Sequence, residues 1–449
     1  MTFLADMGQG EAIGEYRKTS NYMIRDQIIE AVGGSLAAAG DVELVDGRRF
    51  IVMPGLINAH MHTWQTALRS VASNWTFPEY ARWVHAGLAT HFRPRDIFIA
   101  TLVGALNQID CGTTTLVDWC HNNPTPAHTD SAIGALRASG MRAMFMHGTP
   151  KPAPKPGEPP YWEILHPREE IVRLRRELAA DAGMLSLGLA ILGPHYATLD
   201  VTLQDFRLAH EFGLIVSMHQ GGGPPKNPEG WPRLEAEGLL NRLVNIVHGN
   251  DLSDEQLSRF VTRDVRFTIT PESELISGHG HPILGRLRDL GAWPSIGADI
   301  ECAHSGEMLT AARMALSHQR SLDNVEARRR GQLGGKSGLR TRDALSWVTV
   351  EGARMLGQED RIGTIAIGKQ ADLVLLRADA LNLQPIHDPI SSVVMQSNPS
   401  NIDSVMIAGR WRKRDGRLLW GDLGSLVEEL CESGRRISRD VGLQPADLN

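Results

Sequence analysis

Histidine and carboxylate side chains stand at the ends of short apolar runs in the middle of this 449-residue chain. His60 and His62 end the first run. Because strand side chains alternate in direction, residues two apart point to the same side, so this pair aims two imidazoles at one place. The HxH pattern alone is a weak signal, since the chain contains 17 histidines and such pairs arise by chance.

Three later residues strengthen the pattern, because each stands at the end of a further apolar run: His219, His248 and Asp299. Any one of these histidines alone would more often be a core or capping residue. Three of these four histidines together with the carboxylate would form a ligand set suited to Zn²⁺ or Fe²⁺. The series therefore predicts a metal centre.

Eight apolar runs alternate with segments that have a helical pattern. The runs cover residues 54–62, 113–118, 141–147, 186–195, 215–219, 244–248, 265–272 and 293–299. Such alternation indicates βα units around a parallel sheet. Eight units predict an α/β fold, a (β/α)8 TIM barrel, whose active site lies at the carboxyl ends of the strands. A doubly wound open sheet is the alternative, but its glycine-rich dinucleotide turn is missing after the first run.

The two ends of the chain have a different pattern of short strands and tight turns, such as Asp415-Gly416. They indicate β-hairpins, which we expect to form one small β-sandwich domain built from both chain ends. The predicted segments are 1–53 and 359–423 for the two parts of the sandwich, 54–358 for the barrel and 424–449 for a helical tail. A Pro-rich segment, 151–160, follows the third run, and it fits a stiff surface insertion better than a lid.

Composition excludes several classes of protein. The formal net charge is −6 with no long basic run, which argues against nucleic acid as a partner. The most apolar internal run, 184–192, is far shorter than the roughly 20 residues that cross a bilayer, so we expect no membrane partner. Four scattered cysteines without a CxxC pattern, and a start without a secretory signal, favour a cytoplasmic location.

Several motifs resemble those of the amidohydrolase superfamily, in the branch of cytosine, guanine and adenosine-analogue deaminases and triazine hydrolases. MPGLINAHMH, ending at His62, is similar to its PGLxNxHxH signature. Further similar motifs follow in order: CGTTTLVD from Cys111, GPHY from Gly193, VH ending at His248, GAD ending at Asp299 and GTIAIGKQAD from Gly363. The resemblance implies a metal-dependent (β/α)8 barrel with a small β-sandwich. The family's opening strand is hard to find in residues 1–22, where we expect either an incomplete sandwich or a poorly formed strand.

The resemblance also implies the chemistry. His60, His62, His219 and Asp299 would bind one divalent metal ion, with Zn²⁺ preferred to Fe²⁺. Metal-bound hydroxide would hydrolyse a C–N bond, by deamination or displacement of another leaving group on a nitrogen heterocycle. Asp299 would be the base, and His248 would contact the water or the small-molecule substrate. Hydrolysis of a cyclic or linear amide is the alternative, followed by a non-catalytic scaffold; the superfamily further implies a homodimer.

One position departs from the family pattern. Related deaminases carry a Glu three residues after the fifth-strand His, where it acts as a second acid, but this chain has Gly222 there. Glycine cannot transfer a proton. Glu272 and Glu274, near the end of the seventh run, are candidates for this proton shuttle. The alternative is that both lie on a solvated loop and bind Arg or Lys side chains.

Four residues are candidates for contact with substrate. Trp64 and Trp119 follow the first two runs, where aromatic rings suit a flat heterocycle. Gln65 could contact a heteroatom of the substrate, and His195 could donate a hydrogen bond as its family equivalent does. Packing of the first loop is the alternative for the tryptophans, and fixing of a loop is the alternative for His195.

Overall fold

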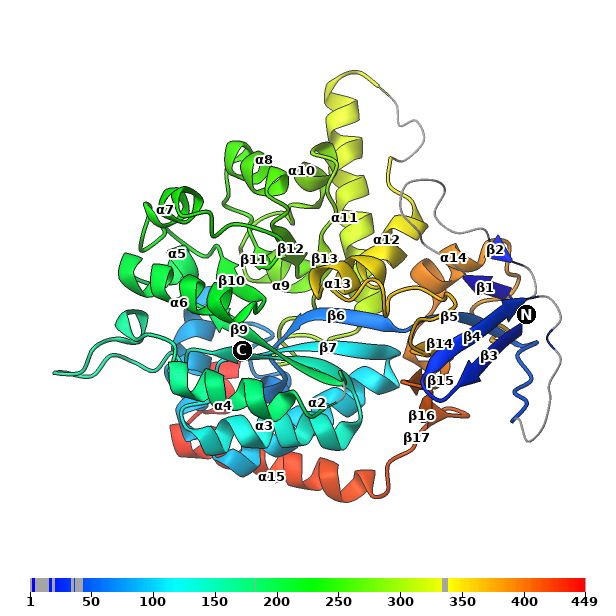
Figure 1. The fold of residues 1–449 in the computed structure, drawn as a ribbon, viewed down its shortest axis with the longest axis horizontal. Helices are drawn as coiled ribbons and strands as arrows, with labels where there is room; N and C mark the ends of the chain where they lie inside the picture. Colours follow the sequence, from blue (N-terminus) through cyan, green and yellow to red (C-terminus); the bar gives the residue numbers. More distant parts are fainter. Residues whose placement is uncertain are drawn as a thin grey trace. The chain divides into compact units, whose positions relative to one another are not determined.

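The computed structural model describes residues 2–4, 16–17, 21–33, 36, 43–181, 183–332 and 338–448. Eight strands form one sheet in the order β13-β12-β11-β10-β9-β8-β7-β6 (Figure 1). They are β6 (Leu56–Met61), β7 (Thr113–Cys120), β8 (Arg142–Gly148), β9 (Leu185–Ile191), β10 (Val216–Gln220), β11 (Val244–His248), β12 (Arg266–Ile269) and β13 (Ser295–Ile296). Each coincides with one of the eight predicted runs, so the barrel is confirmed.

The segment that follows the last barrel strand, β13, pairs with the first barrel strand, β6. A parallel bridge joins Met61 to Asp299. Around it, His62 N donates to Asp299 O at 2.8 Å, and Asp299 N donates to His60 O at 2.9 Å. Gly297 allows this approach, because a Cβ there would lie 2.6 Å from the Cβ of His60. The near-closure of the barrel thus brings three predicted ligands onto adjacent backbone.

Helices alternate with the barrel strands, as predicted. The longer ones are α2 (Pro94–Asp110), α3 (Pro126–Ser139), α4 (Arg168–Leu178), α6 (Leu199–Phe212), α7 (Gly230–Ala236), α8 (Asp254–Thr262), α11 (Met308–Arg329), α12 (Thr341–Trp347) and α15 (Leu423–Val441). The capping box predicted from Ser253 and Gln256 begins α8, with Gln256 N donating to Ser253 Oγ at 3.1 Å. No helix among the described residues is long and apolar enough to cross a membrane.

Short helical turns complete the connections. They are η1 (Thr63–Leu68), α1 (Phe77–Tyr80), η2 (Ala81–His85), η3 (Leu88–His91), η4 (Tyr161–Glu163), α5 (Gly193–Tyr196), α9 (Pro271–Ile276), α10 (Leu284–Asp289), α13 (Val350–Met355), α14 (Pro389–Ser391), η5 (Ser392–Gln396), η6 (Pro399–Asn401) and η7 (Pro445–Leu448). Several of these turns directly follow a barrel strand. They carry residues that were expected on strand ends, including His195 and Glu272.

The chain forms two compact units. The first contains residues 1–58, 107–115 and 307–421, and the second contains 59–106, 116–306 and 422–449. All the candidate site residues belong to the second unit. The helical segment expected at the end of the chain is α15, where Arg436 Nη2 lies 2.6 Å from Asp96 Oδ2 within the same unit.

The first unit contains the sandwich formed from both chain ends. Its larger sheet has the order β17-β16-β15-β14-β5-β1-β2, and β3 pairs with β4 as a separate hairpin. The strands are β1 (Thr2–Leu4), β2 (Tyr16–Arg17), β3 (Asn21–Arg25), β4 (Ile28–Gly33), β5 (Phe50–Pro54), β14 (Leu373–Arg377), β15 (Ile402–Ile407), β16 (Arg410–Arg414) and β17 (Arg417–Leu418). Of the two expectations for the N-terminal end, the absence of an opening strand is wrong, because the short strand β1 pairs with β5.

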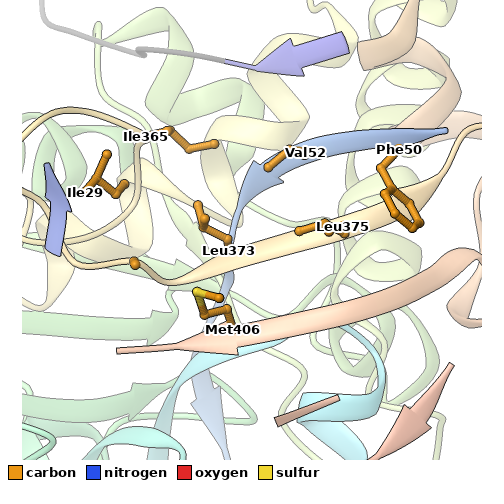
Figure 2. Packing of buried hydrophobic residues seen from close by; sticks show 8 residues of the cluster. Ile29, Phe50, Val52, Ile365, Leu373, Leu375 and Met406 are labelled. Carbon is orange, nitrogen blue, oxygen red and sulfur yellow. The ribbon is translucent and has the colours of Figure 1, made fainter. Parts of the chain in front are cut away.

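A buried apolar cluster holds this sandwich together (Figure 2). Ile29 of the hairpin packs in one cluster with Val52 of β5, Leu373 and Leu375 of β14, and Met406 of β15. In β5 and β14, which pair antiparallel, Val52 lies opposite Leu375. Segments more than 300 residues apart in sequence are joined because each buries one apolar face that it cannot bury alone.

Candidate metal centre

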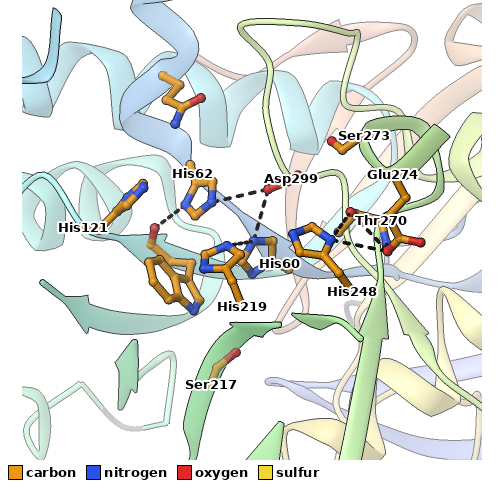
Figure 3. A network of polar contacts seen from close by, with 12 residues as sticks. His60, His62, His121, Ser217, His219, His248, Thr270, Ser273, Glu274 and Asp299 are labelled. Carbon is orange, nitrogen blue, oxygen red and sulfur yellow. Dashed lines mark hydrogen bonds and ion pairs between the residues drawn. The ribbon is translucent and has the colours of Figure 1, made fainter. Parts of the chain in front are cut away.

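Three imidazoles and one carboxylate converge at the carboxyl ends of β6, β10 and β13 (Figure 3). Asp299 Oδ1 lies 3.2 Å from His60 Nε2 and 3.3 Å from His62 Nε2. His219 Nε2 lies 3.2 Å from His60 Nε2. One ligand atom from each of these four residues lies within 4.8 Å of the others. The predicted ligand set is therefore brought together by the fold.

The protonation of these side chains suits metal binding. Burial lowers the pKa of His60 to about 3 and the pKa of His219 well below its usual value, so both imidazoles are neutral and offer lone pairs. Burial disfavours the charge on Asp299, but hydrogen bonds with His60 and His62 hold its pKa well below the usual range. Neutral imidazoles and an ionised carboxylate are the forms in which these groups bind zinc.

A backbone contact fixes the orientation of His62. Its Nδ1 donates to Trp119 O at 2.7 Å, and this contact turns Nε2 toward Asp299 Oδ1, 3.3 Å away. Metal-ligating histidines commonly donate the other ring N–H to a carbonyl or carboxylate in this way. The donor set, its burial and this contact together fit a divalent ion such as Zn²⁺ or Fe²⁺.

His248 lies beside this cluster, and its Nδ1 contacts two side chains on the other side of the ring. Its Nδ1 lies 3.0 Å from Thr270 Oγ1 and 3.4 Å from Glu274 Oε1. Burial opposes a charge on His248, but the hydrogen bond and charge of Glu274, with Asp299, raise its pKa. His248 and Asp299 both have positive φ, 68° and 62°, a strained conformation for non-glycine residues that occurs at functional sites.

Glu272 and Glu274 lie on the helical turn α9 and are buried, so the solvated-loop interpretation does not hold. Glu274 Oε1 accepts a hydrogen bond from Thr270 N at 2.7 Å, and its Oε2 accepts one from Asn250 Nδ2 at 3.2 Å. Glu272 is directed elsewhere, with Oε2 3.8 Å from His304 Nδ1. Of the two, Glu274 is the one that contacts His248.

A cavity of about 460 Å³ opens onto the cluster, a volume that suits a small ligand. His62, His219, His248 and Asp299 line its inner end. Aromatic and apolar side chains supply much of the remaining wall, including Phe77, Tyr80, Tyr161, Trp162 and Tyr196. Flat faces of this kind suit a heterocyclic ring.

The four residues predicted to touch substrate are buried behind this wall. Trp64 Nε1 donates to His121 Nδ1 at 3.1 Å, and Gln65 Nε2 donates to Tyr80 Oη at 2.7 Å. His121 and Tyr80 are the residues that line the cavity. The structure therefore gives Trp64 and Gln65 contacts through which they orient wall residues.

Trp119 and His195 likewise support their neighbours. The Trp119 ring centroid lies 4.3 Å from that of His219. His195 Nδ1 accepts a hydrogen bond from Gln220 Nε2 at 3.0 Å. Sequence reasoning missed the wall residues His121 and Lys151; each follows an apolar run closely, which is the signal that could have found them.

Gly222, where related deaminases carry Glu, has φ 91°. A Cβ there would lie 2.9 Å from Phe77 Cε1 and 3.2 Å from Tyr196 Oη. The space that a side chain would need is thus occupied by the aromatic wall. The aromatic wall therefore leaves no room for a glutamate side chain at position 222.

Comparison with known proteins supports this assignment. An 8-oxoguanine deaminase from Pseudomonas aeruginosa is 27% identical over 428 residues, which cover 89% of this chain and 91% of the relative. A 5-methylthioadenosine/S-adenosylhomocysteine deaminase from Desulforudis audaxviator is 28% identical over 418 residues, covering 89% and 90% of the two chains.

Solved structures show the same fold. A zinc complex of a mutant atrazine chlorohydrolase from Arthrobacter aurescens matches with a TM-score of 0.83 at 21% identity, over 96% of this chain and 98% of that one. A zinc-bound adenosine deaminase from Xanthomonas campestris matches with a TM-score of 0.78 at 23% identity, over 95% of both chains. The sequence pattern of the amidohydrolase family matches residues 51–412. The chain therefore belongs to the amidohydrolase family.

Proposed function

We propose that this protein is a zinc-dependent hydrolase that removes an amino group, or another leaving group, from a nitrogen heterocycle. The observation that carries this proposal is the convergence of His60, His62, His219 and Asp299, of which the last three line an aromatic-walled cavity. The deaminase relatives and the zinc-bound structural neighbours support it.

The side chains around the cluster divide the proton transfers between them. A divalent ion, when bound, lowers the pKa of a water so that it can act as a nucleophile near neutral pH. Asp299, an ionised carboxylate lining the cavity, accepts the proton released in the attack. His248, with its pKa raised, donates a proton to the ring or the leaving group. Glu274 acts through His248 as a positioning residue, because its carboxylate faces Nδ1.

Ammonia release is the direct test. The purified, zinc-loaded protein is incubated with a panel of aminated purines, pyrimidines, pterins and triazines, and ammonia is measured. We expect release from at least one compound, and loss of it in His219→Ala. Turnover of the panel by His219→Ala at the wild-type rate would contradict the proposal.

Amide hydrolysis is the second candidate, and Gly222 favours it, because opening an amide can use the eighth-strand Asp alone as the proton shuttle. Carboxylate formation from cyclic and linear amides, without ammonia release from heterocycles, would select this alternative. A metal content below about 0.2 equivalents after growth with zinc would instead favour a scaffold protein, since a retained site binds its ion tightly.

A further inference from the structure

We propose that Lys151 makes this cavity selective for heterocycles that carry an anionic oxygen, as a carboxylate substituent or as a deprotonated ring oxygen. The inference rests on the proposed function, because it assigns a substrate class to the same cavity. The proposal also gives a role to the start of the Pro-rich segment, for which the sequence favours a surface insertion over a lid.

Lys151 follows β8 by three residues and lines the cavity together with Pro152, Ala153 and Pro154. Its Nζ lies 5.7 Å from the ring centroid of Trp119 and 5.3 Å from that of Tyr196. Aromatic faces attract a cation but leave its N–H groups without a strong acceptor. Within the described part of the chain, no carboxylate lies within ion-pair distance of this ammonium group. Its donors therefore remain available to a ligand.

The charged side chains that line the cavity also favour an anionic ligand. Among the described residues that line the cavity, Asp299 is the only acidic one, whereas Arg82 and Lys151 are both basic. Asp299 is already engaged with His60 and His62. A bound divalent ion would add further positive charge. An enclosed wall with an excess of one sign of charge concentrates ligands of the opposite sign.

A second N–H group in the cavity wall, that of His121, also lacks a hydrogen-bond acceptor among the described residues. The indole N–H of Trp64 donates a hydrogen bond to Nδ1 of His121. Because Nδ1 accepts this bond, it carries no proton, and the ring proton of His121 lies on Nε2. This Nε2 is buried without a hydrogen-bond partner among the described residues. A buried donor is costly unless it is satisfied, so the cavity favours a ligand that brings acceptors.

Burial lowers the pKa of Lys151 to about 8. The amine is therefore still mostly protonated at pH 7, and an anion bound beside it would raise the pKa. The wall thus supplies a cation at neutral pH, and this half-buried ammonium group has already lost part of its contact with bulk water.

The test compares two matched pairs of probes by calorimetry on the zinc-loaded protein at pH 7. Pyridine-3-carboxylate against pyridine-3-carboxamide tests a carboxylate substituent, and barbiturate against uracil tests a ring oxyanion. The variants are Lys151→Met and Lys151→Arg. Lys155→Met is the control, because Lys155 is exposed in the same segment and does not line the cavity.

We expect the wild type and Lys155→Met to bind the anion of at least one pair roughly 10- to 100-fold more tightly than its neutral partner, the range of a charged hydrogen bond. Lys151→Met should abolish this preference while binding the neutral probe within about twofold, which also shows an intact cavity. Lys151→Arg should retain at least part of the preference for the anion. The probe pair that shows this preference identifies the anionic oxygen as that of a carboxylate substituent or of the ring.

Two results would overturn the inference: no preference for the anion in the wild type, or a preference that survives Lys151→Met because the ion alone holds the anion. Binding is read without turnover. Absence of ammonia release, which contradicts the proposed function, is therefore a separate result from loss of the anion preference.

Discussion

At the scale of single residues, the cluster combines ligand groups with a buried acid–base pair. Glu274 is fully buried, and its carboxylate receives hydrogen bonds from Thr270 N and Asn250 Nδ2. These hydrogen bonds hold the Glu274 carboxylate in place, and the carboxylate in turn orients the imidazole that it faces. His248 is thereby oriented through its Nδ1, and the pKa of its ring is raised.

Replacing Glu274 by Gln should lower turnover roughly 10²-fold, the usual worth of a positioned acid or base, while zinc content is unchanged. The variant loses the charge that raises the pKa of His248. If His248 must be protonated to act, the basic limb of the pH–kcat/KM profile should therefore move to lower pH. Glu272→Gln, on the same helical turn, is the control. An equal loss of turnover and an equal shift of the basic limb in this variant would contradict the role of Glu274.

At the scale of elements, the turns that follow the strands decide what faces the cavity. The turn after β10 contains Gly222, whose backbone is left-handed and whose Cα faces Phe77 of α1. A side chain there meets both backbone strain and a steric clash. The aromatic side chains thus leave no room for an acidic side chain at this position.

Gly222→Glu should therefore not create a better deaminase. We expect a lower thermal midpoint, from strain of about 1–3 kcal/mol, and activity no higher than that of the wild type. Adding Phe77→Ala should recover part of the midpoint, because it removes the closest contact. A single variant with full stability and increased ammonia release would disprove this reading of the turn.

A second buried pair joins elements away from the cluster. His166 Nε2 donates to His147 O at the end of β8, at 2.9 Å, and Nδ1 lies 3.3 Å from Asp205 Oδ2 of α6. Both ring nitrogens act as donors, so the imidazole is charged. Burial opposes that charge, but Asp205 outweighs it and raises the pKa of His166.

Asp205→Asn should destabilise the protein by about 3–5 kcal/mol, because it leaves a buried charge without its partner. The folded pKa of His166 lies above its unfolded value. The stability gained from the charge is therefore complete below the unfolded pKa, about 6.5, and is lost as the pH rises through the folded pKa. The difference in thermal midpoint between wild type and variant should shrink from pH 6 to pH 9; a constant difference would contradict the pairing.

At the scale of the whole molecule, a metal ion bound at the cluster would link strands from opposite parts of the barrel. His60 and His62 belong to the first strand and the residue beyond it, His219 to the fifth, and Asp299 follows the eighth. An ion that binds only the folded state stabilises it by about 2.7 kcal/mol at one hundred times its Kd.

Removal of metal by a chelator should therefore lower the thermal midpoint, and zinc should restore it. His219→Ala should have a midpoint that chelation does not change, because a ligand is missing. His210→Ala, at an exposed histidine on α6, is the control and should respond as the wild type does. A midpoint that is insensitive to chelation in the wild type would show that no ion is held. The homodimer and the cytoplasmic location stay predictions of the sequence.

The sequence by itself determined the eight strands, the sandwich from the chain ends and the meeting of His60, His62, His219 and Asp299. These follow from local periodicity and from the rule that parallel strands place their carboxyl ends at one edge. Only the tertiary structure decided that Gln65 and Trp64 lie behind the wall. Which side of a wall a residue faces depends on packing against segments far along the chain, such as Trp64 against His121, and no local pattern encodes it.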